Sequence, residues 1–192
     1  MMDDLAKAVE RMQAEGADFC DARYQVITSN GIAVVDGAVR RISEDKVRGA
    51  CLRARKRGSW GYATTVDVSK DVLLEAAVKA ARNALGGNAL GKPIPDTGEM
   101  RRDLKAEVAI HPNKVGMDEK VLAVLDMDRA QKVDPRIVNT NSLLREEVRE
   151  NMLVNSHDRR LSWEEVRSTI MVEAVASEAG RTEFFYDIRG GA

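Results

Sequence analysis

Two stretches of the chain share one pattern of hydrophobic and polar positions. One, VRGACLRARKRGSWGYATT, begins at Val47, and the other, VRSTIMVEAVASEAGRTEFFYD, begins at Val166. In both, small apolar residues occupy alternate positions, a charged turn with glycine follows, and aromatic residues come last. Alternation with one apolar face is typical of half-buried antiparallel strands. Each stretch therefore predicts a hairpin with one face in the core.

The alternation also predicts which side chains of these hairpins are buried. Arg53, Arg55 and Glu173 are expected on the face opposite the core, because they alternate with the apolar positions. The side chains expected in the core are Ala50, Leu52 and Ala54 in the first stretch and Ile170, Val172 and Ala174 in the second.

Helical periodicity precedes each stretch and also lies between them. Asp3 or Asp4 is expected to cap the first helix and Ser69 the second, and Gly86-Gly87 follow the second as a stop signal. Three helices are expected, near residues 3–15, 69–85 and 118–132. Their apolar positions are Leu5, Ala8, Val9 and Met12 in the first, Leu73, Ala76, Ala77, Ala80 and Ala84 in the second, and Val121, Leu122 and Leu125 in the third.

Strands and tight turns follow the first and third helices. The segments ARYQVI from Ala22 and RIVNT from Arg136 are expected as strands, each leading into a hairpin. The first hairpin is expected to turn at Asp36-Gly37, because Asp-Gly between apolar runs favours a two-residue turn. The second is expected to turn between Asn155 and Asp158. Each copy is thus a helix, a strand and two hairpins.

The repeated order of elements predicts an α+β fold. It consists of two helix-plus-antiparallel-meander repeats joined by a helix and a Pro/Gly-rich loop. We expect the whole chain, residues 1–192, to form one domain, with possible subdomains at 1–90 and 112–192 and a linker at 91–111.

Composition and charge fit a globular protein and exclude several classes. The 192 residues are 44% hydrophobic and 32% charged, and the net charge of −1 argues against a generic nucleic-acid binder. Aromatic residues make up only 4%, so Ala, Val, Leu and Met must form the core. No apolar run approaches the roughly 18 residues of a membrane span, and the charged N-terminus lacks a signal peptide's apolar segment. Two cysteines form no disulfide framework, so a cytoplasmic location is expected.

Two motifs resemble phosphate-binding segments. GGNALGK, residues 86–92, has the spacing of a phosphate-binding loop, but a helix precedes it and Pro93 replaces the hydroxyl that would hold magnesium. A glycine helix stop followed by a loop is the better interpretation. RARKRG, residues 53–58, places two arginines on the exposed face of a strand before a turn. This arrangement favours a solvated hairpin end over a phosphate grip.

The histidines and cysteines have no neighbours in the sequence that would make them metal ligands or nucleophiles. His111 and His157 have no cysteine or histidine partner at a metal-ligand spacing, and both are expected to be solvated. Cys20 and Cys51 have no helix N-terminus or cationic histidine beside them. We expect them to be small buried residues rather than nucleophiles.

The carboxylate pairs give no stronger indication of chemistry. Asp126/Asp128 and Glu164/Glu165 are common patterns in so charged a chain, and surface charge is the expected role. The residues therefore define no catalytic, cofactor-binding or metal site, and the pattern describes a scaffold or binding module.

The order and the amino-acid sequences of several segments resemble the N-terminal region of the TldD/PmbA family, whose characterised members include zinc metallopeptidases. The resemblance covers essentially the whole chain. The segments are ADFCDARYQ from Ala17, VVDGAVRRISEDKVRGACLRA from Val34, GSWGYATTVDVSKDVLLEAAVKAAR from Gly58, VDPRIV from Val133, REEVRENMLVNS from Arg145 and GRTEFFYDIRGG from Gly180.

The resemblance implies a non-catalytic, substrate-enclosing and dimer-forming domain of a peptidase that acts on peptides or small unfolded proteins. The family binds zinc through an HExxxH motif and a further cysteine, in the second half of a chain more than twice this long. No HExxxH occurs here, so zinc is expected only in the full-length protein. The implied partners are the chain's own C-terminal domain, a second TldD/PmbA-family subunit in a homo- or heterodimer, and a peptide substrate.

Two other roles stay open. PmbA-like members lack the metal ligands and serve as inactive partner subunits, and the chain could also be a stand-alone binding or assembly module. The closing segment FFYDIRGGA, without a terminal helix or polar tail, is expected to be a cut end rather than a natural terminus.

Overall fold

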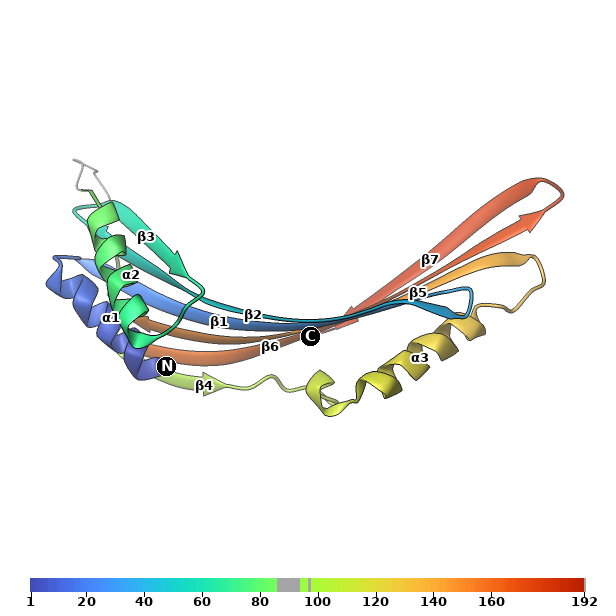
Figure 1. Ribbon diagram of the computed structural model, residues 1–192, viewed down its shortest axis with the longest axis horizontal. Helices are drawn as coiled ribbons and strands as arrows, with labels where there is room; N and C mark the ends of the chain where they lie inside the picture. Colours follow the sequence, from blue (N-terminus) through green and yellow to red (C-terminus); the bar gives the residue numbers. More distant parts are fainter. Residues whose placement is uncertain (86–93, 97, 192) are drawn as a thin grey trace. The chain divides into compact units, whose positions relative to one another are not determined.

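The fold combines seven strands with three α-helices. The computed structural model describes residues 1–85, 94–96 and 98–191 (Figure 1). In this part of the chain the helices are α1 (Met2–Ala14), α2 (Lys70–Asn83) and α3 (Met117–Ala130), with a 3-10 helix η1 (Pro112–Lys114). The strands are β1 (Phe19–Val35), β2 (Ala38–Lys56), β3 (Ser59–Thr65), β4 (Met100–Leu104), β5 (Ile137–Asn155), β6 (Arg159–Glu178) and β7 (Arg181–Gly191).

The strands form one sheet, whose organisation confirms the α+β prediction. Their order is β3-β2-β1-β5-β6-β4, and β7 also pairs with β6. The hairpins β2–β3 and β6–β7 are antiparallel, whereas β4 is a parallel edge strand on β6. A helix followed by three strands occurs twice, as α1-β1-β2-β3 and as α3-β5-β6-β7. The repeated order predicted from the sequence is therefore present.

β1 and β5 are longer than the sequence pattern predicted. β1 joins the strand expected from Ala22 and the first arm of the hairpin in one element of 17 residues, and β5 has 19. The two strands run antiparallel, because Asp36 N donates to the Thr140 carbonyl at 3.0 Å while Ser156 N donates to the Cys20 carbonyl at 2.9 Å. The end of each strand thus bonds near the start of the other.

Both predicted hairpin turns are present. Asp36 and Gly37 have φ values of 50° and 75°, as a two-residue turn between twisted strands requires. The turn between β5 and β6 is closed by the Asn155 side chain, whose oxygen accepts from the backbone N–H of His157 at 2.9 Å and of Arg159 at 3.2 Å.

The helix ends differ in detail from the prediction. α1 begins after Met1, so Asp3 and Asp4 lie in its first turn and neither is the cap. Ser69 is the N-cap of α2, but its side chain makes no capping hydrogen bond. The predicted stop at Gly86-Gly87 lies outside the described residues.

The chain forms two compact units, and the four longest strands contribute to both. Unit 1 comprises Met1–Val26, Val47–Lys105 and Glu150–Glu164, and unit 2 comprises Ile27–Lys46, Ala106–Arg149 and Glu165–Ala192. The division into subdomains 1–90 and 112–192 stays a prediction. In the expected linker 91–111, residues 91–93 and 97 lie outside the described part, and β4 occupies Met100–Leu104.

Unit 1 buries one sheet face under α1 and α2 (Figure 1). The alternation predicted for β2 is confirmed, because the side chains of Ala50, Leu52 and Ala54 are at most 5% exposed. The helices contribute the stripes expected of them, namely Leu5, Ala8, Val9 and Met12 from α1 and Leu73, Ala76, Ala77, Ala80 and Ala84 from α2.

Small residues allow α2 to approach the sheet closely. A Cβ atom placed on Gly61 of β3 would collide with the backbone of Ala80, Asn83 and Ala84. Backbone atoms of a packed helix cannot yield as a flexible side chain can, so this position requires glycine. The alanine-rich stripe of α2 and Gly61 together form a core with few aromatic residues.

Unit 2 has a smaller core under α3. Its fully buried apolar residues are Ile32 and Val34 of β1 and Val124 of α3. Val121 and Leu125 pack against them as predicted, whereas Leu122 is 60% exposed and its expected burial is wrong.

The burial predicted for β6 is also wrong. Ile170 is 36% exposed, and Val172 and Ala174 are only half-buried. The core cluster of unit 2 draws on β1, α3 and β5 and contains no described residue of β6 or β7. The alternation correctly predicted that β6 is a strand. It could not predict that, among the described helices, none covers the face that carries Ile170.

Leu52→Ala should lower the free energy of unfolding by about 2–5 kcal/mol, because the side chain is fully buried and its loss leaves a cavity. Val47→Ala on the same strand is the control, since Val47 is 59% exposed and should change stability by no more than about 0.5 kcal/mol. Denaturant melts of both variants check this. Equal losses would show that the wrong face of β2 has been assigned to the core.

Candidate functional site

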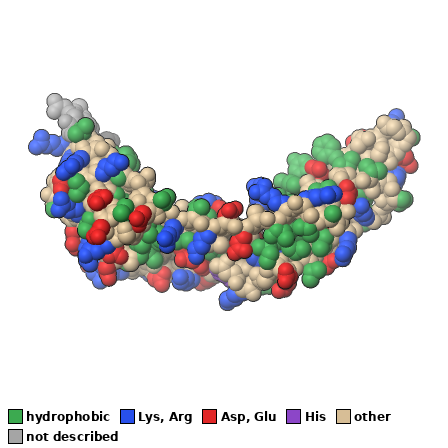
Figure 2. Space-filling view, viewed as in Figure 1, with side chains coloured by type: hydrophobic (Ala, Val, Ile, Leu, Met, Phe, Trp, Pro, Cys, Tyr) green, Lys and Arg blue, Asp and Glu red, His purple; other side chains and the backbone are tan. Residues whose placement is uncertain are grey.

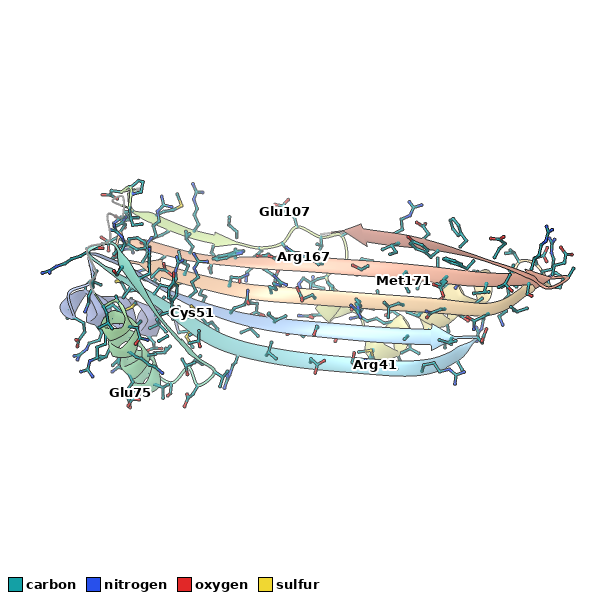
Figure 3. The ribbon with its side chains drawn as sticks, turned by 90° about the horizontal axis from the view of Figure 1, so that it is seen from above. Arg41, Cys51, Glu75, Glu107, Arg167 and Met171 are labelled. Carbon is teal, nitrogen blue, oxygen red and sulfur yellow. The ribbon has the colours of Figure 1, made fainter. Side chains whose placement is uncertain are left out.

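An open trough lies on the sheet face of unit 2 that points away from α3. It has a volume of about 670 Å³. Figure 3 shows Arg41 on β2 and Arg167 and Met171 on β6 from above this face. The trough is lined by Ser29, Asn30, Gly31, Ile32 and Ala33 of β1, Arg41 and Ser43 of β2, Leu143, Arg145, Glu146, Glu147 and Arg149 of β5, and Arg167 and Thr169 of β6.

Strand alternation places small side chains along the floor of the trough. Ile32 and Val34 face α3, so the intervening Gly31 and Ala33 face the trough. A Cβ atom on Gly31 would lie only 2.8 Å from the Ser43 Oγ atom, which shows how closely β2 closes over this position. β1 therefore forms a low floor between the longer side chains of β2 and β5.

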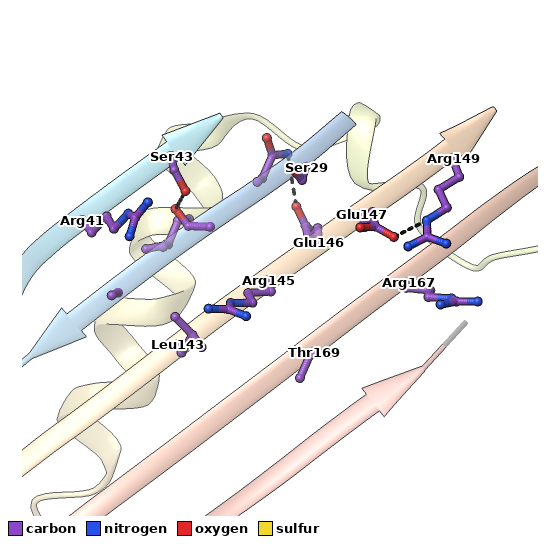
Figure 4. A pocket seen from close by; sticks show the side chains of 14 residues that line it. Ser29, Arg41, Ser43, Leu143, Arg145, Glu146, Glu147, Arg149, Arg167 and Thr169 are labelled. Carbon is purple, nitrogen blue, oxygen red and sulfur yellow. Dashed lines mark hydrogen bonds and ion pairs between the residues drawn. The ribbon is translucent and has the colours of Figure 1, made fainter. Parts of the chain in front are cut away.

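Arginines stand on both sides of this floor. Asn30 and Glu146 contact each other across β1 and β5 on the α3 side, at 3.5 Å, so their neighbours Gly31 and Arg145 are adjacent on the trough side. Arg41 and Arg145 extend their guanidinium groups toward β1 from its two sides (Figure 4). Both side chains are exposed.

The carboxylates near the trough leave part of its positive charge unpaired. Glu147 pairs with Arg149, with Nε and Oε1 2.5 Å apart, and Glu165 pairs with Arg167 at 3.3 Å. Arg41 and Arg145 form no ion pair or side-chain hydrogen bond with any residue that the structure describes.

Glu146 does not offset this charge. Although it borders the trough, its carboxylate turns to the opposite face and pairs there with Lys120 of α3, whose side chain is 5% exposed. The trough therefore presents two guanidinium groups to any ligand that enters it.

A second hollow in unit 2 is lined by the charged residues Asp134, Arg136 and Glu178 and also by Arg181 and Glu183. Asp134 and Arg136 form a bidentate pair with distances of 2.8 and 2.9 Å, and Arg136 also bonds Glu178 at 3.2 Å. The hydrogen bonds from the Arg136 side chain hold the pKa of Asp134 well below its usual range. Asp134, Arg136 and Glu178 therefore satisfy one another, whereas no ion pair with another described residue neutralises Arg181.

The basic cluster of residues 53–58 is not the solvated hairpin end that the sequence predicted. Asp21 is 2% exposed and accepts from Arg53 Nε at 3.0 and 2.9 Å and from Arg53 Nη2 at 2.5 Å. These hydrogen bonds raise the pKa of Arg53. The guanidinium group also lies 5.3 Å from the centre of the Trp60 ring, which in turn stacks on Tyr62. Arg53 is therefore a structural cation.

Arg55 is likewise held in place. It lies on the predicted face, opposite the core, but is only 8% exposed and pairs with Asp18 at 3.2 Å. The other Asp18 oxygen accepts from the Arg57 backbone N–H at 2.7 Å and fixes the β2–β3 turn. The phosphate-grip alternative is not supported, because the carboxylates of Asp18 and Asp21 already neutralise these arginines.

The carboxylate pair Asp126/Asp128 separates into one surface and one buried group. Asp126 is exposed and pairs with Arg129 at 3.1 Å. Asp128 is 1% exposed, so its expected surface role is wrong. Its carboxylate accepts from the backbone N–H of Gly37 at 2.7 Å and from the hydroxyls of Thr140 at 2.9 Å and Ser142 at 3.2 Å. It fastens α3 to the β1–β2 turn and to β5.

The two cysteines differ in burial. Cys20 is fully buried, and this burial raises the pKa of its thiol to about 12. A thiol that keeps its proton at neutral pH is a poor nucleophile. Cys51 is half-buried on the opposite face of the sheet.

Neither histidine is freely solvated as the sequence suggested. The His157 ring packs edge-on against Phe19 at 5.1 Å, and its side chain is 21% exposed. His111 caps η1, where its Nδ1 atom accepts from the Asn113 backbone N–H at 3.2 Å.

Among the described residues no three His, Cys, Asp or Glu side chains are grouped as metal ligands. Glu164 and Glu165 lie on β6, where Glu165 binds Arg167. The phosphate-loop spacing at residues 86–92 lies outside the described part of the chain. Within the same limits, no helix is long and apolar enough to cross a membrane.

Comparisons with known families show to which family the chain belongs. Residues 20–85 match the description of PmbA/TldA metallopeptidase domain 1, and residues 110–192 match the PmbA/TldA metallopeptidase central domain. The chain belongs to the TldD/PmbA family. The two matches follow each other in chain order and together cover most of the sequence.

Curated relatives of this TldD/PmbA chain are longer metalloproteases. A metalloprotease of Methanocaldococcus jannaschii is 23% identical over 180 residues, which are 92% of this chain and 40% of the relative. A metalloprotease of Methanothermobacter thermautotrophicus is 27% identical over 179 residues, 91% of this chain and 37% of the relative. The chain thus spans about two fifths of their length.

Solved structures of the same fold are also longer. A candidate modulator of a DNA gyrase from Thermotoga maritima superposes with a TM-score of 0.77 at 13% identity, over 97% of this chain and 42% of the other. TldE from Thermococcus kodakarensis gives a TM-score of 0.73 at 15% identity, over 97% and 42%. At these identities the likeness establishes the fold alone.

Sequence reasoning missed the arginine-lined trough of this TldD/PmbA chain. The signal was present, because Arg145 and Arg149 stand at even spacing in β5 and the small residues Ser29, Gly31 and Ala33 alternate in β1. Only the pairing of β2, β1, β5 and β6 brings these segments together, and the sequence did not predict that β1 would neighbour β5.

Asp128→Ala should lower the free energy of unfolding by at least about 2 kcal/mol, because the buried hydroxyls of Thr140 and Ser142 and the backbone N–H of Gly37 lose a charged acceptor. Asp126→Ala, two residues away on the exposed side of α3, should change it by no more than about 0.5 kcal/mol. Thermal and denaturant unfolding of the two variants measure the difference. Equal stability of the two would contradict the assigned role of Asp128.

Cys20 should resist alkylation in the native protein. In a Cys51→Ser background, iodoacetamide at pH 8 should label Cys20 only after denaturant is added, because the buried thiol stays protonated. Mass spectrometry follows the label, and native labelling at the rate of the unfolded chain would refute the burial of this side chain.

The same thiol should also affect stability at high pH. Burial raises its pKa from 9.0 to about 12, so the folded state binds this proton more tightly than the unfolded state. The resulting stability is complete below pH 9 and is lost as pH rises toward 12. The fall in the free energy of unfolding between pH 9 and 11 should be smaller in Cys20→Ala than in the parent protein.

Proposed function

We propose that this chain is the non-catalytic, substrate-enclosing and dimer-forming N-terminal part of a TldD-like zinc metallopeptidase of the cytoplasm. The observation that carries the proposal is the match to two successive PmbA/TldA metallopeptidase domains. The metalloprotease names of relatives that are more than twice as long support it. In this view the chain contributes the walls of a peptide-binding space and not the reacting groups.

The sheet of unit 2 suits contact with an extended peptide. β3 pairs with β2 only from Ala50 to Lys56, so the segment of β2 from Ala38 to Gly49 is an edge with β1 as its described neighbour. Backbone N–H and C=O groups on such an edge can bond a peptide without reading its sequence. Charged residues such as Arg40 and Arg41 discourage pairing with a second sheet while leaving this edge accessible.

An exposed hydrophobic surface on β7 supports the proposed contact with another domain or subunit. Figure 2 shows hydrophobic side chains gathered over β7. Contiguous apolar surface of this kind marks protein interfaces. The exposed residues on one face of β7 are Phe184 at 69%, Tyr186 at 55% and Ile188 at 52%, and Phe185 at 72% points to the opposite face.

The described residues do not fit a zinc site. The two histidines of the sequence are His111 and His157, and each packs or bonds within its own local structure. No step of hydrolysis is therefore assigned to these residues, and we place the zinc in the longer protein.

The experiment compares the 192-residue chain with the longer protein to which it is proposed to belong. Unstructured peptides should be cleaved by the longer protein and not by the chain alone, since amide hydrolysis at neutral pH requires an activated water. A chelator should abolish the activity, and elemental analysis should find zinc only in the longer protein. Mixing with a second family subunit tests whether the pair is required.

Three results would change the assignment. Chelator-resistant cleavage by the short chain would contradict its non-catalytic role. A longer protein without the HExxxH motif would be a PmbA-like partner subunit. A gene that ends at Ala192 would favour a stand-alone binding module.

A further inference from the structure

We propose that the trough on unit 2 binds an acidic stretch of an extended peptide through Arg41 and Arg145. The inference rests on the proposed function, because it names the chemical class of substrate that the chain would favour. It begins from the two of the four trough arginines that have no ion pair among the described residues, whereas Glu147 and Glu165 pair with the other two.

The geometry favours side-chain carboxylates of an extended segment. The floor from Ser29 to Ala33 is five residues of β1, about 16 Å long at the usual rise per residue. Arg145 flanks the floor beside Gly31, and Arg41 flanks it from the other side (Figure 4). A segment of about five extended residues can lie along this floor and place carboxylates against guanidinium groups on both sides.

The small floor residues matter because they leave room for a backbone. Gly31 contributes no side chain, although the Ser43 hydroxyl of β2 occupies the space beside it, and Ala33 and Ser29 contribute short side chains. Guanidinium groups bind carboxylates in a planar, bidentate manner that ammonium groups cannot reproduce. Charge thus supplies the selectivity, while the strand-like floor supplies the shape.

The test measures binding to the 192-residue chain of fluorescein-labelled, C-terminally amidated peptides built from Gly and Ser. One peptide carries three Glu residues at alternate positions and another carries Gln at the same positions. Amidation removes the terminal carboxylate, and the anionic fluorescein label is common to both peptides, so a difference between them comes from the Glu side chains. The Glu peptide should bind at least about fivefold more tightly at low salt, and added salt should reduce the difference.

Paired variants locate the effect. Arg41→Gln with Arg145→Gln should remove the preference for the Glu peptide, whereas Arg82→Gln with Arg102→Gln should keep it. The control pair changes the net charge equally at two exposed positions outside the trough. Circular dichroism melts confirm that each variant folds, and the charge-retaining pair R41K and R145K should keep part of the preference.

Each outcome decides the proposal. Equal binding of Glu and Gln peptides would overturn the acidic preference and leave the proposed function standing, because peptides would still bind. Equal loss in both variant pairs would show that net charge and not the trough is responsible. Equal competition by single-stranded DNA or inorganic phosphate would mean that the trough binds any anion. No binding of any peptide would overturn the inference and also weaken the substrate-enclosing role.

Discussion

Burial of one sheet face under helices is the constraint on which the rest of the structure depends. The four longest strands have 17 to 20 residues, and a sheet of this length exposes two faces that must be covered or made polar. In unit 1 the cover is α1 and α2, and in unit 2 it is α3. In unit 1 the alanines of α2 and Gly61 of β3 form the contact, so these layers approach closely with few aromatic residues.

The same constraint determines the chemistry of the uncovered faces. Strand alternation sends every second side chain away from the helices, and those positions carry arginines, carboxylates and small polar residues. In unit 1 the carboxylates of Asp21 and Asp18 neutralise Arg53 and Arg55. In unit 2 Glu146 is turned toward Lys120 under α3, and Arg41 and Arg145 keep their charge available. The trough thus keeps its positive charge because β5 places the Glu146 carboxylate on the face toward α3 and Arg145 on the opposite face.

The sequence predicted which helices and strands form better than it predicted which of them lie side by side in the fold. Helix positions, both hairpin turns and the buried face of β2 follow from local periodicity, and the structure confirms them. The exposure of Ile170 could not be predicted, because alternation shows that a strand has two different faces but not whether a helix covers one of them. Asp128 looked like surface charge because its donors Gly37, Thr140 and Ser142 are distant in the sequence. The sequence did not predict the trough either, because the residues that line it come from β1, β2, β5 and β6, which are separate segments of the sequence.

The most direct test of the account is chemical-shift mapping of the isotopically labelled chain during titration with an extended acidic peptide. The central claim is that the face of unit 2 turned away from α3 is the binding face. It predicts that the largest shifts occur at backbone amides of residues 29–33 and 143–149, with only small changes in α3. Shifts concentrated in α3 or on β7, with the amides of residues 29–33 unchanged, would contradict it.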